Sequence, residues 1–244
     1  MNFEDEVKER IDTNRNNKGL KSNAHDFMQA SIASRYSYNF SWLGRPIIQY
    51  PQDIIAMQEI IWKVRPELII ETGVAHGGSL IFSAAMLELV ALCTGSEGEV
   101  VGIDIDIRSH NRKAIEEHPM FKRINMIEGS SIDPEIVSQV VKLANGKKRI
   151  LVCLDSNHTH EHVIEELNAY APLTTVGSYC VVFDTIVEDL PGELAMDRPW
   201  CPGNNPKTAV FDYLKTHPEF EIDVELQNKI LITVAPDGYL KRVR

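Results

Sequence analysis

The run LDSNHTHEH at 154–162 is the densest group of side chains in this sequence that could do chemistry. Asp155 follows an apolar segment, His158 comes three residues later, and Asp184 ends the next apolar segment along the chain. Two carboxylates suit a hard divalent cation such as Mg²⁺. Oxygen atoms of water and of the substrate can complete its coordination shell. A metal-bound hydroxyl loses its proton more easily, and an imidazole can accept that proton near neutral pH. We therefore expect Asp155 and Asp184 to be metal ligands and His158 to be the general base.

A glycine-rich turn between an apolar run and a helical pattern indicates a cofactor site. Gly73 and the pair Gly77-Gly78 allow positive φ angles and a close approach of a ligand to the backbone. Ser79 and the free amides at the start of the helix suit an anionic group. The dinucleotide fingerprint is G-x-G-x-x-G with an acid about 20 residues later. Here the glycine spacing differs and the next strand-end acid, Asp104, lies about thirty residues on, which favours S-adenosylmethionine.

Each part of S-adenosylmethionine has an expected partner in this interpretation. Its carboxylate would meet the turn, its ribose hydroxyls would meet Asp104, and its adenine edge would lie along Ser130 or Ser131. Asp106 competes for the ribose, although alternation along the strand directs its side chain the other way. The expected cofactor-binding residues are Glu71, Gly73, Ala75, Gly77, Ser79, Asp104, Ser130, Ser131 and Asp155.

Short apolar runs and helical patterns alternate from residue 67 onward, which predicts parallel βαβ units and a sheet covered by helices on both faces. The expected strands are 67–71, 99–104, 124–128, 149–154 and 178–184, and the expected helices are 78–92, 108–117, 134–144 and 159–170. A helix at 206–216 and two closely spaced strands at 220–224 and 229–234 then predict an antiparallel hairpin at the sheet edge. The expected fold class is α/β, a doubly wound, mostly parallel seven-stranded sheet of the Rossmann-like class I methyltransferase type.

Ligands of doubly wound sheets bind beyond the carboxyl ends of the strands, so the polar residue that ends each strand matters most. Five expected strands end at or beside an acid, namely Glu71, Asp104, Glu128, Asp155 and Asp184. Turns and helix caps also favour Asp, so a structural role is the competing interpretation for each of them.

The first part of the chain differs in character from the rest. We expect 1–52 to form an N-terminal arm and an aromatic cap, and 53–244 to form the cofactor-binding domain, with Asp53 as the N-cap of its first helix. Residues 1–25 are polar and lack a continuous apolar stripe, which is typical of a mobile or partner-docked arm. The aromatic residues that follow could cap a pocket, contact another subunit or join the core; they are Phe27, Tyr36, Tyr38, Phe40 and Trp42.

The connection at 187–205 is rich in Pro, Gly and Asp and too long for a plain link, so we expect a lid or a substrate loop.

The bulk composition narrows the class of protein. A length of 244 residues suits one α/β domain, and a net charge of −10 argues against nucleic-acid or anionic-membrane partners, leaving a small-molecule substrate. The sequence shows no secretory signal and no apolar run long enough to cross a bilayer, so we expect a cytoplasmic protein. The four scattered cysteines are expected to be reduced and structural; they are Cys93, Cys153, Cys180 and Cys201.

Four motifs in order give the sequence a family resemblance. They are the glycine turn, VGIDIDIR at 101–108, the cluster at 155–163, and GNNPKTAV at 203–210. With these motifs the chain, from about Phe27 to its end, resembles the cephalosporin hydroxylase and rhamnosyl O-methyltransferase family. That resemblance implies a class I S-adenosylmethionine-binding fold, Mg²⁺ dependence, homo-oligomers, and methylation of hydroxyl groups on sugars or natural products.

The resemblance also assigns residues. Asp155 and Asp184 match the metal acids of the fourth and fifth strands, and His158 stands where related catechol-type enzymes place their base. Some relatives carry a second acid directly before the strand-five acid, where this chain has Phe183, and the hydroxyl of Thr185 could fill that coordination place.

Asn204, Asn205 and Lys207 match a family loop motif on the substrate side of the pocket. Their competing interpretation is helix capping, with Asn205 before Pro206 at a first helical position.

Three other functions remain open at this point. Asp155 and His158 with either His160 or His162 could form a two-histidine, one-carboxylate iron site of an oxygenase, although such enzymes usually have β-barrel folds. The competing interpretation of His160 and His162 is that they lie in the first turn of a helix and face solvent or a neighbouring chain. A nicotinamide-dependent oxidoreductase and a non-catalytic S-adenosylmethionine-binding subunit are the other two. The function that the sequence favours is a Mg²⁺-assisted O-methyltransferase acting on a hydroxyl of a sugar or a glycosylated metabolite.

Overall fold

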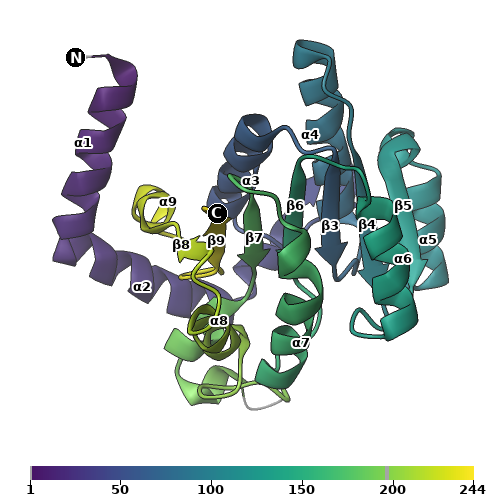
Figure 1. Ribbon diagram of the computed structural model, residues 1–244. Coiled ribbons are helices and arrows are strands. Elements are labelled where there is room, and N and C mark those ends of the chain that lie inside the picture. Colours follow the sequence, from purple (N-terminus) through teal and green to yellow (C-terminus); the bar gives the residue numbers. More distant parts are fainter. Residues whose placement is uncertain (1, 196–197) are drawn as a thin grey trace.

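A seven-stranded sheet with the strand order β5-β4-β3-β6-β7-β9-β8 forms the centre of the protein (Figure 1). The computed structural model describes residues 2–195 and 198–244. All neighbouring strands are parallel except at β9, which runs antiparallel to both β7 and β8. The strands are β3 (Leu68–Thr72), β4 (Glu99–Asp104), β5 (Ile124–Glu128), β6 (Ile150–Leu154), β7 (Tyr179–Val182), β8 (Phe220–Ile222) and β9 (Tyr239–Arg242). The predicted fold class is confirmed.

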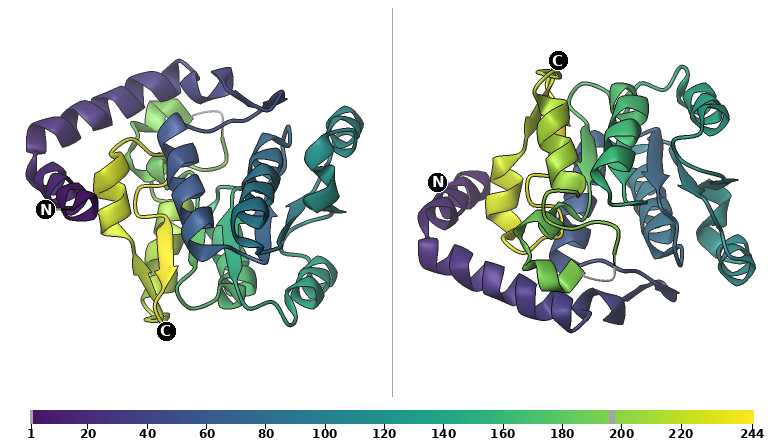
Figure 2. Two further views of the ribbon diagram at one scale, coloured as in Figure 1. Left: turned by 90° about the horizontal axis from the view of Figure 1, so that it is seen from above. Right: turned by 90° about the horizontal axis from the view of Figure 1, so that it is seen from below.

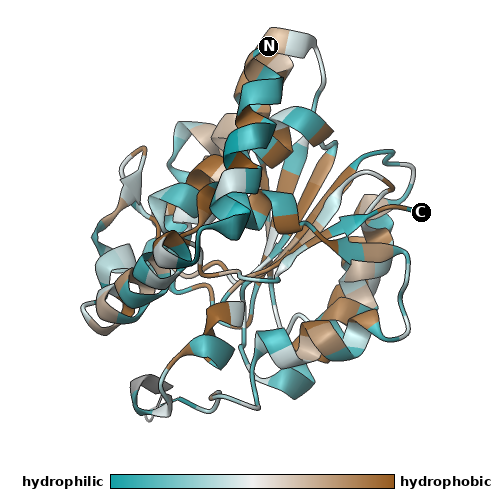
Figure 3. Cartoon of the chain, turned by 90° about the vertical axis from the view of Figure 1, so that its left-hand side faces the viewer, coloured by the Kyte–Doolittle hydropathy of each residue, from teal (hydrophilic) through white to brown (hydrophobic). Residues whose placement is uncertain are grey.

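Helices cover both faces of this sheet, which is why its central strands are apolar along their whole length. Every residue of β3 and β6 is buried. Ile69 and Leu151 pack with α3, α4 and α5, whereas Ile70 and Val152 pack with α6, α7 and α8. Figure 2 shows these helix groups on opposite sides of the sheet, and Figure 3 shows its apolar strands in brown between them. The helices are α3 (Pro51–Val64), α4 (Gly78–Thr94), α5 (Ser109–Glu116), α6 (Pro134–Ala144), α7 (His160–Tyr170) and α8 (Pro206–Leu214).

The chain reverses its direction of travel across the sheet at β3, because β4 and β5 lie on one side of it and β6 on the other. Such a switch point is where doubly wound sheets bind ligands. The turn after β3 and the residue after β6 touch there: the Asp155 amide donates to the Thr72 carbonyl at 2.9 Å. Gly73 has φ +89°, and a Cβ at this position would overlap the Asp155 carbonyl oxygen. Only glycine therefore fits between the turn and Asp155.

The C-terminal region forms the antiparallel edge that the sequence predicts, but with a different second strand. The segment expected as a strand at 229–234 is the end of helix α9 (Val224–Ile230) and a loop, and the last strand is β9. Asp223 caps α9 by accepting from the Leu226 amide, and Leu231 ends the helix with φ +59°. The apolar residues of 229–234 thus reflect a helix packed on the sheet rather than a strand.

The N-terminal arm, which we expect to be mobile or docked on a partner, is helical in the structure. It forms α1 (Phe3–Asn16) and α2 (Lys18–Ala33), which Asn2 and Asn17 cap through their side chains. No residue of α1 is buried, and Figure 1 shows it standing off the sheet beside α9, where Asn14 donates to the Asn228 carbonyl at 3.2 Å. Helix α1 is outside the core, as its polar composition indicates, whereas Met28 of α2 is part of the core.

Between α2 and α3 lie a 3₁₀ turn, η1 (Tyr36–Asn39), and a two-stranded hairpin of β1 (Ser41–Trp42) and β2 (Arg45–Pro46). The aromatic residues here mostly pack inward: Tyr36 contacts Phe27, Phe40 and Tyr50, and Trp42 contacts Phe82 of α4. This cap therefore belongs to the same body as the sheet.

Asp53 is not the N-cap of α3, which begins at Pro51 after Tyr50. Its carboxylate is fully buried and accepts from the Thr233 and Tyr239 hydroxyls and from the Val234 amide. These bonds fix the C-terminal loop to α3. Burial raises the pKa of Asp53 to about 6.

No helix within the described residues is long and apolar enough to cross a membrane.

Candidate active site

A cleft of about 1230 Å³ lies at the carboxyl ends of the parallel strands. Its floor combines the glycine turn after β3, Asp104 after β4, Ser130 and Ser131 after β5, Asp155 after β6, and Asp184 after β7. These five groups are separate in sequence and meet because parallel strands end at one edge of a sheet.

Asp155, His158 and Asp184 form one cluster in this cleft. A potential ligand atom from each lies within 4.8 Å of the others, and this is the only such group in the part of the chain that the structure describes. The His158 Nε2 lies 3.2 Å from Asp184 Oδ2. Asp184 adopts φ +55°, which non-glycine residues rarely do, directly after β7. The two acids therefore share one rim, as the sequence analysis predicts.

The cluster fits a divalent cation in its donor chemistry. Burial and the nearby Asp184 charge raise the pKa of Asp155 well above its usual range. A cation between the two carboxylates would offset this repulsion, and hard oxygen donors are the ligands that Mg²⁺ prefers.

Trp200 was not singled out from the sequence, although it lies in the predicted substrate loop. Its ring stands edge-on to His158 with centroids 4.7 Å apart, and Arg198 lies over its face. Both residues line the cleft. Residues 196 and 197 of the same loop lie outside the described residues.

The glycine turn is open to the cleft, as is Ser79. Its hydroxyl donates to Glu71, so this side chain is engaged within the protein and the backbone amides at the start of α4 remain for a ligand. Glu71 is buried beneath the cleft lining, and burial raises its pKa to about 7. Gly77 is the N-cap of α4, with φ +81°, and does not line the cleft.

Asp104 lines the cleft and also supports the turn. One of its oxygens accepts from the Val74 and Ala75 amides at 2.8 and 3.2 Å, and the other accepts from the Asp106 amide at 3.1 Å. A carboxylate has about four acceptor sites, so roughly one remains for a ribose hydroxyl. The competing Asp106 side chain is 70% exposed and does not line the cleft.

Ser131 and His162 form a network apart from the cluster of Asp155, His158 and Asp184. The His162 Nε2 lies 3.1 Å from the Ser131 hydroxyl and 3.2 Å from the Ser156 hydroxyl. His160 instead contacts the Thr208 hydroxyl at 2.9 Å. Neither histidine joins Asp155 and His158, so the structure does not assemble the iron site considered above.

Thr185 and Phe183 do not contribute to the cluster. The Thr185 hydroxyl is buried and donates to the Pro236 carbonyl at 2.6 Å, so we leave it out of the proposed ligands. Phe183 is buried in the core beside α3. The cluster thus offers two carboxylates and one imidazole.

The motif at 204–207 anchors the loop 187–205. Asn204 accepts from the His160 amide, and Asn205 caps α8 while donating to Glu188 and to the Cys201 carbonyl. The Lys207 ammonium, with a side chain only 7% exposed, bonds Asp189 at 2.6 Å and Asp237 at 3.1 Å. Capping, the competing interpretation of Asn205, describes part of its role.

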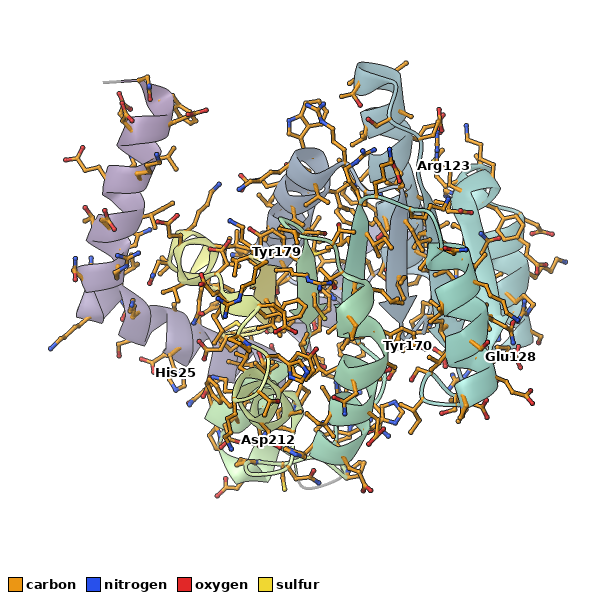
Figure 4. All side chains as sticks on the ribbon, in the orientation of Figure 1. His25, Arg123, Glu128, Tyr170, Tyr179 and Asp212 are labelled. Carbon is orange, nitrogen blue, oxygen red and sulfur yellow. The ribbon has the colours of Figure 1, made fainter. Side chains whose placement is uncertain are left out.

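Glu128 is the strand-end acid that stays outside the site. Figure 4 labels it on the far side of the sheet, where it bonds Arg112 at 2.7 Å. All four cysteines are free, with Cys153 and Cys180 buried and Cys93 and Cys201 exposed.

Comparison with known proteins places this geometry in a family. Residues 34–243 match the family model for Rhamnosyl O-methyltransferase/CmcI. The chain belongs to this family. Rhamnosyl O-methyltransferase of Mycobacterium tuberculosis is 31% identical over 195 residues, covering 78% of this chain and 73% of that protein. The Mycobacterium leprae protein of the same name is 30% identical over 204 residues, covering 83% and 82%.

Solved structures agree on the fold of this rhamnosyl O-methyltransferase/CmcI family member. CmcI with Mg and SAM has a TM-score of 0.58 at 19% identity, covering 85% of this chain and 78% of that one. The MycE methyltransferase of mycinamycin biosynthesis, with Mg and SAH, has a TM-score of 0.52 at 16% identity, covering 89% and 55%. The chain is accordingly a class I, S-adenosylmethionine-dependent O-methyltransferase.

Proposed function

We propose that this enzyme methylates a hydroxyl of a sugar or a glycosylated small molecule, with Mg²⁺ held by Asp155 and Asp184. The observation that carries the proposal is the cluster of Asp155, His158 and Asp184 beside the open glycine turn. The mycobacterial relatives are named for a rhamnosyl acceptor, and the CmcI and MycE structures contain Mg, which supports both parts.

The roles follow from the positions of these residues. Asp155 and Asp184 would hold the cation, which lowers the pKa of an acceptor hydroxyl bound to it. His158 would accept the hydroxyl proton on its imidazole. As the new oxygen–methyl bond forms, the sulfur–methyl bond breaks and its electron pair stays on sulfur. Orientation in the cleft supplies the remaining rate, because the sulfonium is already activated.

The cofactor side would use the turn at 73–79 and the strand ends. Amides at the start of α4 would face the carboxylate of S-adenosylmethionine, Asp104 its ribose, and Ser130 and Ser131 its adenine edge. Glu71 would act beneath the turn through Ser79.

The opposite side of the cleft suits an acceptor with an apolar body. Ile186, Val187 and Leu190 form part of its wall, and Trp200 stands beside the proposed base. An aromatic ring can cover the apolar face of a sugar, while the polar edge of the ring stays available for hydrogen bonds. The formal charge of −10 is consistent with a small-molecule substrate rather than nucleic acid.

The test compares His158→Ala, Asp155→Asn and Asp184→Asn in a coupled assay of S-adenosylhomocysteine release with a rhamnosylated acceptor. We expect His158→Ala to lower kcat by about 10²- to 10⁴-fold with an unchanged Kd for S-adenosylhomocysteine, because the base does not touch the cofactor. The two Asn variants should lose Mg²⁺ stimulation as well as rate.

Full activity of both Asn variants, with or without EDTA, would remove the metal from the mechanism.

A further inference from the structure

The turn at 73–77 has an unusual backbone for a loop that must receive a ligand. Gly73, Ala75 and Gly77 all have positive φ, at +89°, +46° and +81°. For Ala75 this conformation is strained, because its Cβ approaches the carbonyl oxygen. Such a conformation persists only where surrounding contacts hold it in place.

Two side chains hold the carbonyl groups of this turn from behind. The Asn111 amide donates to the Ala75 carbonyl at 2.9 Å. The Arg45 guanidinium donates to the His76 carbonyl through Nη2 at 2.6 Å and through Nε at 3.1 Å. Arg45 Nη2 also bonds Asn111 Oδ1 at 3.1 Å, so the two side chains form one connected network.

The opposite side of the turn is held independently by Asp104, which accepts from the Val74 and Ala75 amides. Amides and carbonyls of the same turn are therefore bonded by different elements, β4 on one side and the β1–β2 hairpin with α5 on the other. Asn111 is only 4% exposed, and neither it nor Arg45 lines the cleft. These two residues can affect a ligand only through the turn.

The fork of Arg45 is required for this arrangement. One guanidinium reaches His76 through two nitrogens and Asn111 through one of them, whereas an ammonium offers all of its donors from one nitrogen. The hairpin brings it into place, since Pro46 packs so closely on α4 that a Cβ on Gly78 would overlap the Pro46 carbonyl.

We propose that Arg45 and Asn111 are positioning residues that hold the turn at 73–77 in its cofactor-binding conformation before S-adenosylmethionine arrives. The inference concerns cofactor affinity and rests only on the S-adenosylmethionine dependence of the family, not on the acceptor or the metal. Without the network, the turn would spend part of its time in conformations that relieve the strain at Ala75. The apparent Kd would then rise in inverse proportion to the competent fraction.

The experiment measures S-adenosylhomocysteine binding to the full-length, metal-free protein by calorimetry, without acceptor. We expect Arg45→Lys to raise Kd about tenfold, corresponding to a turn that is competent about one-tenth of the time, and Arg45→Met to raise it further. Asn111→Ala should resemble Arg45→Met. Lys113→Met is the matched control, because Lys113 lies on the same helix with a side chain 74% exposed and should leave Kd unchanged.

A second readout separates positioning from general destabilisation. Hydrogen exchange of the Val74 and Ala75 amides should accelerate in Arg45→Lys, while exchange in β3 and β6 stays as in the wild type. At saturating S-adenosylmethionine, kcat should remain within about twofold, so the defect appears in KM for the cofactor.

An unchanged Kd in Arg45→Met and Asn111→Ala, with exchange at the turn unaltered, would overturn the proposal. If the wild type binds S-adenosylhomocysteine as expected but methylates no hydroxyl, the proposed function fails while this inference stands.

Discussion

At the scale of single residues, three buried carboxyl groups in and near the cleft have raised pKa values. Glu71, Asp53 and Asp155 are three acids that the fold removes from water near the ends of central elements, and in each case burial is the largest cause of a raised pKa. Their hydroxyl and amide partners reduce the cost of burial without cancelling it. Glu71 offers the clearest measurement, because its partners are Ser79 and Ser83 and it is not a proposed metal ligand.

Glu71→Gln should change how stability depends on pH. The pKa of Glu71 is about 7 in the folded protein against an ordinary value of 4.5, so the folded state holds its proton more tightly. The wild type should therefore lose stability relative to Glu71→Gln as pH rises from about 4.5 through 7, by roughly 3 kcal/mol in total. Urea unfolding of both cofactor-free proteins at pH 5 and pH 8 tests this. An equal difference at both pH values would contradict a buried, uncharged Glu71.

The residues that sequence reasoning placed correctly are those whose position follows from strand ends. Asp104, Asp155 and Asp184 each follow an apolar run, and parallel strands deliver such residues to one edge. What sequence reasoning did not foresee is that the Ser79 and Thr185 hydroxyls bond Glu71 and the Pro236 carbonyl. Those partners are set by packing between distant segments, which spacing along the chain does not reveal.

At the scale of elements, the loop between β7 and α8 is held by polar anchors as well as by the apolar contacts of Ile186 and Leu190 with the core. Lys207 joins the start of α8 to Asp189 at the end of the 3₁₀ helix η4 (Thr185–Asp189) and to Asp237 before β9. Because η4 begins directly after Asp184, the same ion pairs also hold in place the segment that carries this proposed metal ligand.

Lys207→Met should destabilise the protein by about 2 kcal/mol, because it leaves two carboxylates without their shared cation while keeping the aliphatic packing. The value is below that of a fully buried pair, since Asp189 and Asp237 are 36% and 29% exposed. Lys215→Met is the control: Lys215 follows the same helix and pairs with Asp212, but its side chain is 71% exposed. Its effect should stay within about 0.5 kcal/mol in urea unfolding. Equal effects of the two variants would show that the Lys207 pairs contribute nothing special.

Elements from 67 to 170 could be predicted from the sequence because burial on both faces produces uninterrupted apolar runs with clear breaks. The C-terminal region could not, since the apolar residues around Ile230 and Ile232 pack against the core from a helix and loop. The true last strand, β9, is only four residues long and is specified by pairing with β7 on one side and β8 on the other. The helices α1 and α2 were missed because their sequences lack an apolar stripe and depend on caps.

At the scale of the whole molecule, α1 contributes no residue to the hydrophobic core. None of its residues is buried, and Phe3 is 74% exposed. A helix that contributes so little to the core suggests another use for its surface, and we propose that it takes part in a homo-oligomer.

Removal of residues 2–16 should leave the fold and S-adenosylhomocysteine affinity intact while lowering the mass of the assembly. Light scattering after size exclusion measures that mass for both proteins, and circular dichroism monitors folding. A truncated protein with the same mass as the full chain would place any subunit contact elsewhere.

Gly73 lies against the backbone of Asp155. We therefore expect the cofactor turn and the proposed metal site to change together during evolution. A homologue can lose the proposed Mg²⁺ site through a change in the Asp155 side chain alone, because the backbone that touches Gly73 stays where it is. Replacement of Gly73, in contrast, would push on that backbone and disturb nucleoside and cation binding at once. Sequences that retain the glycine but not the acid should therefore be metal-independent transferases, whereas those lacking the glycine should have abandoned both ligands.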